Sequence, residues 1–462
     1  MSAPSTTARP PPPSLRKDSR IIIVGSGVFG ISTALWLARA GYRDVTVLDM
    51  QDTAAAGYDP KAGIDSASAD INKIVRFSYG SAVDYQRLAS RAAAEWDEWN
   101  RQIAASTDLP RRFAGDRSRV WLNCGALRQS PTREMTEQEL LTLKSMEQEG
   151  IRDRQFRTDD EADVERARRR GWAHKLDPCR RRERFGHHKA VLDSTAGFVV
   201  AYRGCDWARH MAQKLGVKFI LDSRCGKAID IGGADDGKPT VRTADGTVHK
   251  GDLVVVAGGG WTPSLLPEVD QLLETTGGSV AMIQIPRSRK DLWDRFAPEN
   301  FPVIMEPGIY SFPRDENGIV KIGFRETKNL PELREFGISS TKLCWYTDSV
   351  DNSFLVDFVP GRGGKVAVCS GGSGHGFKFL PILGQEVVKI LEGRGSATPY
   401  GRLWGWRSTS PPASAAVGDA KGKTRNGLGE GEAGPRVLSK LKMASPADWV
   451  FKSGADNRSS KL

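Results

Sequence analysis

The sequence predicts an α/β fold in which a parallel sheet is joined to an α+β second part with a mixed sheet. Residues 21–24 are β-branched and precede a glycine-rich turn and an amphipathic helix, the order of a parallel βαβ unit. A later strand runs straight into glycines at 258–260, which fits a return to the same sheet. Farther on, short strands are separated by turns such as 315–318, which indicates antiparallel pairing.

The first βαβ unit carries the clearest binding motif in the chain. Gly25, Gly27 and Gly30 form a G-x-G-x-x-G pattern between the strand at 21–24 and a helix expected at 28–40. The first glycine permits a tight turn, the second lets a pyrophosphate approach the backbone, and the third lets the helix pack on the strand. The helix N-terminus adds free N–H groups and a positive dipole end for phosphates.

The residues between and after these glycines complete the predicted dinucleotide site. Ser26, Val28 and Phe29 belong to the turn and the first helical residues, and the next strand, 44–48, ends at Asp49. A carboxylate there can accept hydrogen bonds from both ribose hydroxyls and disfavours a 2′-phosphate, so we expect FAD or NAD rather than NADP. The alternative is an ordinary glycine-rich loop, but strand, glycines, helix, strand and acid occur here in the required order.

Composition and charge limit the class of protein. A chain of 462 residues is long enough for two domains or a discontinuous pair. Its net charge of +11 could indicate nucleic-acid binding, but no DNA- or RNA-binding motif accompanies the charge, so no nucleic-acid partner is expected. Much of the excess lies at 166–189, which we interpret as a solvated loop. Positive charge would also attract anionic substrates.

Cysteine spacing and hydropathy argue against a metal site and a membrane span. None of the six cysteines forms a C-x-x-C pair or a zinc-ligand cluster with histidine, so reduced thiols and no metal are expected. No apolar run approaches the roughly 18 residues of a membrane span. Residues 1–20 are rich in proline and serine without an apolar core, so we expect a disordered lead rather than a secretory signal.

The chain ends in Ser460-Lys461-Leu462, the tripeptide that the peroxisomal import receptor reads. Chance occurrence is the alternative, since a tripeptide carries little information by itself. The expected tail, 396–462, is rich in Gly, Ser, Ala and Lys, and a flexible tail would expose such an address. The sequence therefore predicts peroxisomal localisation with the import receptor as a partner.

The middle of the chain alternates helices, strands and loops. After a loop at 52–69, Lys73 and Arg76 stand three residues apart and are expected to share one face of a helical turn. A helix at 82–103 places Trp96 and Trp99 on its apolar face, where we expect them to be core residues. From 111 to 189 the pattern is broken, with a strand at 120–123 and a polar helix at 137–149. Residues 196–200 then lead into an expected helix at 205–215, and short strands are expected at 217–221, 226–231, 240–243 and 253–257.

The last part of the chain repeats the strand-to-glycine pattern. Residues 371–378 are glycine-rich and lead from a strand at 365–370 into a helix at 381–391. This second entry, which contains Gly374 and Phe377, is expected to contact the same ligand. The other expected strands are 279–285, 303–304, 309–312, 319–324, 341–347 and 354–359.

Five segments together resemble one family. They are GSGVFG with Asp49, NKIVRFSYG at 72–80, GIVKIGF at 318–324, CWYTDSVDNSFLVD at 344–357 and SGGSGHGFKFLP at 370–381. As a set they resemble the FAD-dependent amine oxidases that include sarcosine oxidase, L-pipecolate and L-saccharopine oxidase, and fructosyl amino acid oxidase (amadoriase). The resemblance covers about 21–393.

The resemblance implies a Rossmann-type FAD-binding domain with an interleaved mixed-sheet substrate domain. The FAD-binding domain would comprise 21–110, 192–278 and 345–395. The substrate domain would comprise 111–191 and 279–344. The strand order read from the sequence agrees with this arrangement.

The resemblance also implies roles toward the flavin. Cys344 matches the cysteine that joins the flavin covalently through its 8α-methyl group; a buried structural cysteine is the alternative. Lys321 matches the lysine placed over the flavin, where a cation stabilises the charge that develops as oxygen is reduced. Lys73 matches the basic residue near the flavin, and Gly374 and Phe377 belong to the matching glycine-rich segment.

Three further basic residues concern the substrate. Arg76 and Lys378 match residues that hold a substrate carboxylate, with Lys378 also next to the flavin; surface ion pairs are the alternative. Arg325 departs from the pattern, since sarcosine oxidases carry histidine and fructosyl oxidases an acid four residues past the lysine. Side chains alternate along a strand, so Arg325 would share a face with Lys321 and could bind a second substrate carboxylate, or else a protein acid such as Glu326 or Glu306.

The resemblance implies an oxidase acting on a secondary amine of amino-acid type, such as saccharopine, pipecolate or sarcosine. Oxygen would be the acceptor, and the products would be an imine and hydrogen peroxide, which suits a peroxisome. A deglycating fructosyl amino acid oxidase is one alternative. A flavin-binding protein without turnover is another, because the stretch 325–344 looks short for the family. We expect a monomer.

Overall fold

The computed structural model describes residues 14–110, 113, 119–130, 132–306, 309–323 and 331–407. Arg325, the Ser460-Lys461-Leu462 tripeptide and most of the expected lead and tail lie outside these ranges. The folded chain continues past the expected start of the tail at 396. It does so through α11 (Pro399–Leu403), which begins at a Thr398 side-chain cap with proline in its first turn.

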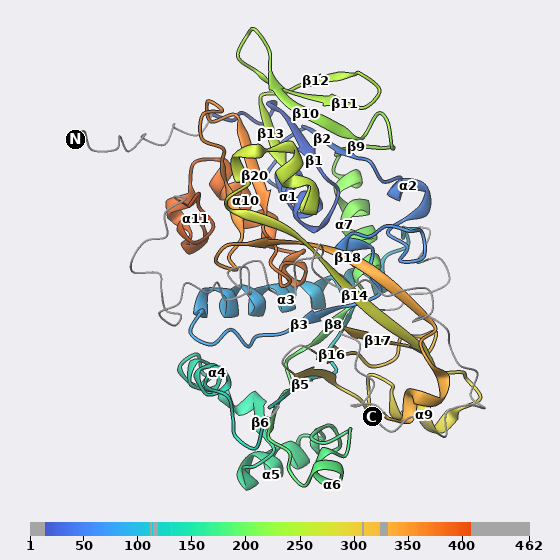
Figure 1. Ribbon diagram of the computed structural model, residues 1–462. Helices are drawn as coiled ribbons and strands as arrows, with labels where there is room; N and C mark the ends of the chain where they lie inside the picture. The colour runs from blue at the N-terminus through green and yellow to red at the C-terminus, as the bar shows by residue number, and fades with distance from the viewer. Residues whose placement is uncertain are drawn as a thin grey trace.

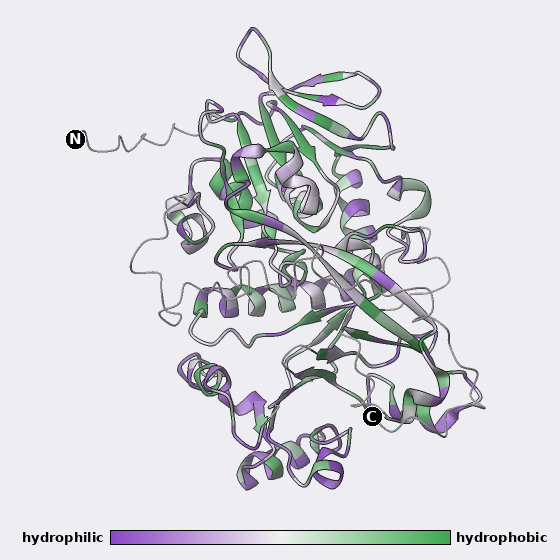
Figure 2. Cartoon of the chain, in the orientation of Figure 1, coloured by the Kyte–Doolittle hydropathy of each residue, from purple (hydrophilic) through white to green (hydrophobic). Residues whose placement is uncertain are grey.

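A six-stranded sheet forms the upper part of the molecule (Figure 1). Its order is β19-β20-β13-β1-β2-β9, parallel except for the β19–β20 pair. The β-branched runs reflect burial on both faces of a parallel sheet, and Figure 2 shows these strands as hydrophobic. The predicted return of the later strand beside the first is confirmed. The bounds are β1 (Arg20–Val24), β2 (Asp44–Asp49), β9 (Lys218–Leu221), β13 (Leu253–Val256), β19 (Leu355–Phe358) and β20 (Val366–Ser370).

Helix α1 (Val28–Arg39) packs against the sheet and against two later helices, α7 (Ala201–Lys214) and α10 (Leu383–Leu391). Its approach to the sheet depends on Gly30, since a Cβ there would lie 1.9 Å from the Gly25 carbonyl oxygen. The expected helix at this position is confirmed. A small antiparallel sheet, β10 (Ala228–Gly233), β11 (Pro239–Thr243) and β12 (Val248–Lys250), lies at the top of Figure 1.

The second large sheet has eight strands in the order β18-β14-β17-β16-β15-β5-β7-β6. It is mixed, because β15 pairs parallel with β5 while the other pairs are antiparallel. The expected domain boundary between 344 and 345 falls inside β18, and the division into domains stays a prediction. The bounds are β5 (Ala126–Gln129), β6 (Gln155–Arg157), β7 (Ala190–Asp193), β14 (Leu273–Gln284), β15 (Val303–Glu306), β16 (Ile309–Ser311), β17 (Ile319–Gly323) and β18 (Ser340–Ser349).

A three-stranded sheet and a long helix lie between the two large sheets (Figure 1). The strands are β3 (Lys73–Val75), β8 (Gly197–Val199) and β4 (Trp121–Leu122), and the helix is α3 (Val83–Ala105). Trp96 and Trp99 of α3 are fully buried, as predicted.

The prediction that Lys73 and Arg76 share one face of a helical turn is wrong. Lys73 begins strand β3, and Arg76 follows its last residue. The physical reason is that Ile74 and Val75 are β-branched and pair with β8, which favours extended backbone over a helical turn.

The prediction that 166–189 forms a solvated loop is also wrong. This stretch overlaps α5 (Glu161–Arg169) and contains α6 (Arg181–Phe185), and several of its basic groups are buried. Arg181 is paired with Glu306 at 2.9 Å, and the Lys175 ammonium donates to two backbone carbonyls. The charges of Arg181 and Lys175 are therefore compensated within the fold, whereas Arg168, Arg170 and Arg180 stay exposed.

The remaining elements are short, except for α4 (Glu137–Gln148), which confirms the predicted polar helix. None of the helices in the described ranges is long and apolar enough to cross a membrane. The other helices are α2 (Thr53–Ala56), α8 (Thr262–Leu265) and α9 (Lys290–Arg295), with 3-10 helices at Ala67–Ala69, Arg152–Arg154, Ala173–Lys175, Gly259–Trp261, Pro267–Val269, Pro331–Phe336, Phe377–Phe379 and Gly395–Ala397.

Candidate active site

A cavity of about 410 Å³ opens at the carboxyl ends of β1, β2, β13 and β20. This is where open α/β sheets bind their ligands. Nine of the residues predicted to bind cofactor line it: Gly25, Ser26, Gly27, Val28, Phe29, Asp49, Lys73, Gly374 and Phe377. The other predicted residues within the described ranges lie near it without forming its wall: Gly30, Arg76, Lys321, Cys344 and Lys378.

The glycine turn leaves the backbone open toward this cavity. Gly25 has φ +106°, and a Cβ there would lie 2.3 Å from the Ala257 carbonyl oxygen. The Val28 amide, at the start of α1, donates to the Ser68 hydroxyl at 3.0 Å. Gly27, the N-cap of α1, also faces this hydroxyl, which would lie 3.4 Å from an added Cβ.

Two backbone amides hold the Asp49 carboxylate at the end of β2, one from the glycine turn and one from the residues that follow β2. The carboxylate accepts from the Ser26 amide at 2.6 Å and the Gln51 amide at 2.8 Å. Burial nevertheless raises the pKa of Asp49. The acid therefore lines the cavity in a fixed orientation, where it could accept from a ribose hydroxyl.

A buried cluster of charges lies at the other end of the cavity, centred on Asp70. The Lys73 and Lys321 ammonium groups each lie 2.7 Å from the same Asp70 oxygen, Oδ2. Lys321 also donates to the Asn72 carbonyl at 2.7 Å, and Lys73 lies 3.5 Å from the Cys344 sulfur. Asp70 and Lys321 are 0% and 1% exposed.

Burial and pairing act in opposite directions on the pKa values of these groups. Burial lowers the pKa of Lys321 to about 8, although the charge of Asp70 raises it. Burial alone would raise the pKa of Asp70, but the charges of Lys321 and Lys73 outweigh it and hold the pKa low. Burial also opposes the charge on Lys73, whose pKa is nevertheless raised by Asp70 and then by Cys344.

A second group of cations lies beside the first. Lys378 is 2% exposed, and its ammonium donates at 2.8 Å to the Tyr79 hydroxyl and to the His375 carbonyl. Arg76 lies over the Tyr79 ring, 4.6 Å from its centroid. Burial, and then the charge of Arg76, lower the pKa of Lys378 well below its usual value. Within the described ranges, neither cation has a carboxylate partner.

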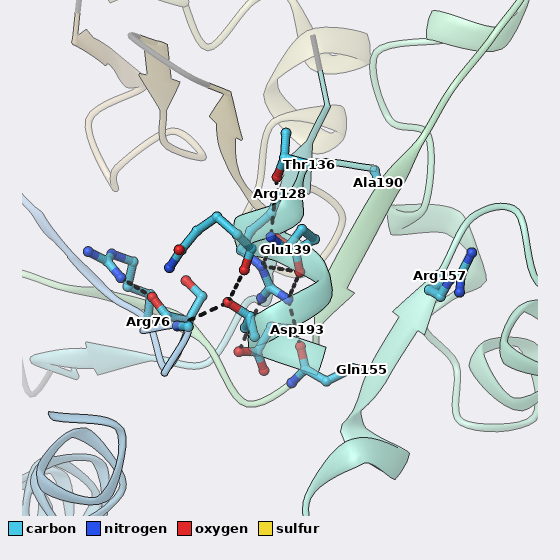
Figure 3. A network of polar contacts seen from close by, with 12 residues as sticks. Arg76, Arg128, Thr136, Glu139, Gln155, Arg157, Ala190 and Asp193 are labelled. Carbon is cyan, nitrogen blue, oxygen red and sulfur yellow. Dashed lines mark hydrogen bonds and ion pairs between the residues drawn. The ribbon is translucent and has the colours of Figure 1, made fainter. Parts of the chain in front are cut away.

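Arg76 also belongs to a wider polar network that reaches α4 (Figure 3). Its guanidinium donates to the Ser78 carbonyl, and two residues later the Gly80 amide donates to Thr142 of α4. Farther along, Arg128 of β5 pairs with Glu139 of α4 at 2.7 Å and with Asp193 at 3.5 Å. The segment that carries Arg76 is thereby fixed against α4.

A family model described as FAD-dependent oxidoreductase matches residues 20–390, which is most of the chain. The chain belongs to this family. FAD, rather than NAD, is therefore the dinucleotide of this site. The family predicted from the sequence motifs is confirmed.

Relatives of this FAD-dependent oxidoreductase include amine oxidases. L-saccharopine oxidase of Schizosaccharomyces pombe is 26% identical over 84% of this chain and 93% of its own length. Monomeric sarcosine oxidase of a Bacillus species is 23% identical over 80% and 92%. A crystal structure of a modified fructosyl peptide oxidase from Aspergillus nidulans covers 88% of this chain and 96% of its own, with TM-score 0.69 and 25% identity. These likenesses bear out the predicted fold class.

The residues present fit FAD. The open glycine turn and Asp49 suit the pyrophosphate and the adenosine ribose, and the opposite end would take the flavin ring. Residues that sequence reasoning missed line or adjoin that end. They are Asp70, Tyr79, Tyr346 and His375. A fifth missed residue, Ser68, lies at the other end, beside the glycine turn. All but Ser68 and Asp70 lie within the quoted motifs, and Asp70 stands three residues before Lys73.

Proposed function

We propose that this FAD-dependent oxidoreductase is an oxidase of secondary amines of amino-acid type. The observation that carries the proposal is the pair Arg76 and Lys378, two cations beside the cavity that have no carboxylate partner among the described residues. A buried ammonium without an anion is costly, so the site calls for a ligand that brings one. The α-carboxylate of an amino acid is such a ligand, and a guanidinium fork suits it.

The chain's own groups would then orient the amine. Arg76 and Lys378 fix the carboxylate, which restricts the position of the carbon between it and the amine nitrogen. When bound, FAD supplies a two-electron acceptor at its ring and returns the electrons to oxygen. Overall, the amine loses a hydride from carbon and a proton from nitrogen, oxygen becomes hydrogen peroxide, and water hydrolyses the imine. Lys321, on β17, would stabilise the negative charge that develops on oxygen.

Cys344 is proposed to hold the flavin covalently. Its sulfur lies 3.5 Å from the Lys73 ammonium, which lines the cavity. This contact holds the sulfur at the flavin end of the cavity, where an 8α-carbon would come within its reach. Formation of a thioether between this thiol and the 8α-carbon would break one S–H and one C–H bond, and the two protons and two electrons released would reduce oxygen to hydrogen peroxide.

Two further proposals concern the whole chain. The Ser460-Lys461-Leu462 tripeptide is proposed to bind the peroxisomal import receptor, since a peroxide producer suits that compartment. The protein is proposed to be a monomer, which light scattering of the purified holoprotein would test.

The function is tested by mixing the holoprotein with sarcosine, pipecolate, saccharopine and fructosyl-valine. Anaerobic mixing should bleach the flavin absorbance with at least one of the first three, and air should then yield one peroxide per amine oxidised. Preference for fructosyl-valine would support the deglycating alternative. Absence of bleaching with every amine would leave a flavin-binding protein without turnover.

A further inference from the structure

One carboxylate oxygen joins two lysines that come from distant parts of the chain. Asp70 lies between the 3-10 helix Ala67–Ala69 and β3, Lys73 begins β3, and Lys321 is on β17. Both ammonium groups lie 2.7 Å from Asp70 Oδ2, while Oδ1 accepts from the Ile71 amide at 2.7 Å. Every oxygen of this carboxylate is therefore engaged, and its position is fixed by its own backbone.

This cluster carries more positive than negative charge. One carboxylate faces two ammonium groups, and Asp70 and Lys321 are almost fully buried. Breaking a buried pair by removing one partner leaves a charge that neither water nor protein compensates. Without Asp70, Lys321 would lose a proton more readily, because burial disfavours the ammonium form and Lys73 repels it.

The other titratable groups around the cluster do not replace Asp70. Cys344 and Tyr346 face it from β18, and Tyr310 faces it from β16. Burial raises the pKa of both tyrosines, so they stay neutral near pH 7. The Cys344 sulfur lies beside Lys73 and would be uncharged once joined to the flavin.

We propose that Asp70 is a positioning residue for the return of electrons to oxygen. It holds Lys73 and Lys321 on one oxygen at the flavin end of the cavity and keeps Lys321 in its ammonium form. The net positive charge that remains after pairing is available to the negative charge that develops on oxygen. This inference rests on the role proposed above for Lys321 and adds the residue that maintains it.

The first test compares pH profiles of the oxidative half-reaction. Holoprotein reduced anaerobically with one equivalent of dithionite is mixed with oxygen between pH 6 and 10, for the unmodified protein and for Asp70→Asn. In the unmodified protein the rate should fall as the pH rises through about 8, because Lys321 loses its proton there. In Asp70→Asn the fall should begin at least one pH unit lower, with a loss of about tenfold at pH 8 that recovers toward pH 6.

A matched control is available on the surface of the molecule. Asp159 also shares its carboxylate between two cations, at 3.0 Å from Arg157 and 2.6 Å from Lys189, far from the cavity lining. Asp159→Asn should leave the pH profile unchanged. An Asp70→Asn profile that coincides with the unmodified one, or a loss that is equal at every pH, would overturn the role of Asp70.

The second test does not depend on turnover. Urea unfolding of the holoprotein is measured for Asp70→Asn, Lys321→Met and the double variant. The double variant should be more stable than Asp70→Asn alone, since it lacks one of the uncompensated ammonium groups. If Asp70→Asn gives no folded protein, adding Lys321→Met should restore folding. Additive effects, or an equally unfolded double variant, would overturn the pairing.

The two proposals fail in different ways. If Lys321→Met reacts with oxygen as fast as the unmodified protein, the role proposed for Lys321 is wrong whatever Asp70 does. If Lys321→Met is slow while Asp70→Asn keeps the original pH profile, only the inference about Asp70 is overturned.

Discussion

At the scale of single residues, the basic side chains of the site outnumber the carboxylates that pair with them. Lys378 and Arg76 have no acidic partner among the described residues, and Lys73 and Lys321 share one. Burial without enough acidic partners lowers the pKa values of Lys378 and Lys321. Basic groups placed in this way beside a cavity indicate that a ligand or a reaction supplies the negative charge that stabilises their charged forms.

Lys378→Met is expected to weaken recognition of the substrate carboxylate. The value of kcat/KM for amino-acid amines should fall roughly 10- to 150-fold, the equivalent of about 1.5–3 kcal/mol for a charged hydrogen bond. The matched control is Lys389→Met, since Lys389 pairs with Glu386 on α10 outside the cavity lining and should leave kcat/KM unchanged. The proposed role fails if amines with and without a carboxylate lose activity equally.

Cys344→Ser is expected to release the flavin. The unmodified holoprotein should stay yellow after acid precipitation, whereas the variant should leave its colour in the supernatant, because a hydroxyl is a far weaker nucleophile than a thiolate. Cys225→Ser serves as control, since Cys225 is partly exposed and lies outside the cavity lining. Free FAD from the unmodified protein would contradict covalent attachment.

At the scale of elements, the sequence predicted what local patterns determine. The strand–glycine–helix–strand–acid order of β1, α1 and β2 was readable because each residue type has a local physical reason. The pairing of Asp70 with Lys321 could not be predicted from the sequence, because it depends on β17 packing beside the start of β3 in the folded chain. The turn at Lys73 was misjudged for a related reason, since pairing with β8 decides its conformation.

Gly30→Ala tests the contact between α1 and the turn. The added Cβ would lie 1.9 Å from the Gly25 carbonyl oxygen, so α1 would have to shift away from the glycine turn. We expect this shift to lower the free energy of unfolding by about 1–3 kcal/mol. FAD affinity, measured by fluorescence titration in a Cys344→Ser background where the flavin is not covalently held, should fall with it. Gly233→Ala is the control, since nothing lies within 4 Å of its added Cβ. Equal effects of the two substitutions would show that the contact does not matter.

At the scale of the whole molecule, the cavity draws on segments that lie far apart in the chain, from Val24 to Phe377. Its wall combines the first βαβ unit, the glycines that follow β13, part of β18 and the second glycine-rich entry. In the basic run of 166–189, by contrast, Arg181 and Lys175 are buried and have partners within the fold, away from the cavity. Net charge alone therefore could not separate structural from functional cations, and only their partners in space did so.

The last prediction concerns where the protein acts. The chain ends in Ser-Lys-Leu, which a peroxisomal receptor reads as an address. An oxidase that forms peroxide as proposed would release it next to the enzymes that consume it. A fluorescent tag at the N-terminus leaves this end free, and the tagged protein should show punctate staining that overlaps a peroxisomal marker. Deletion of Leu462 should make the staining diffuse, whereas substitution of Asp456 by Asn, outside the tripeptide, should leave it punctate. Punctate staining that persists without Leu462 would show that the tripeptide is accidental.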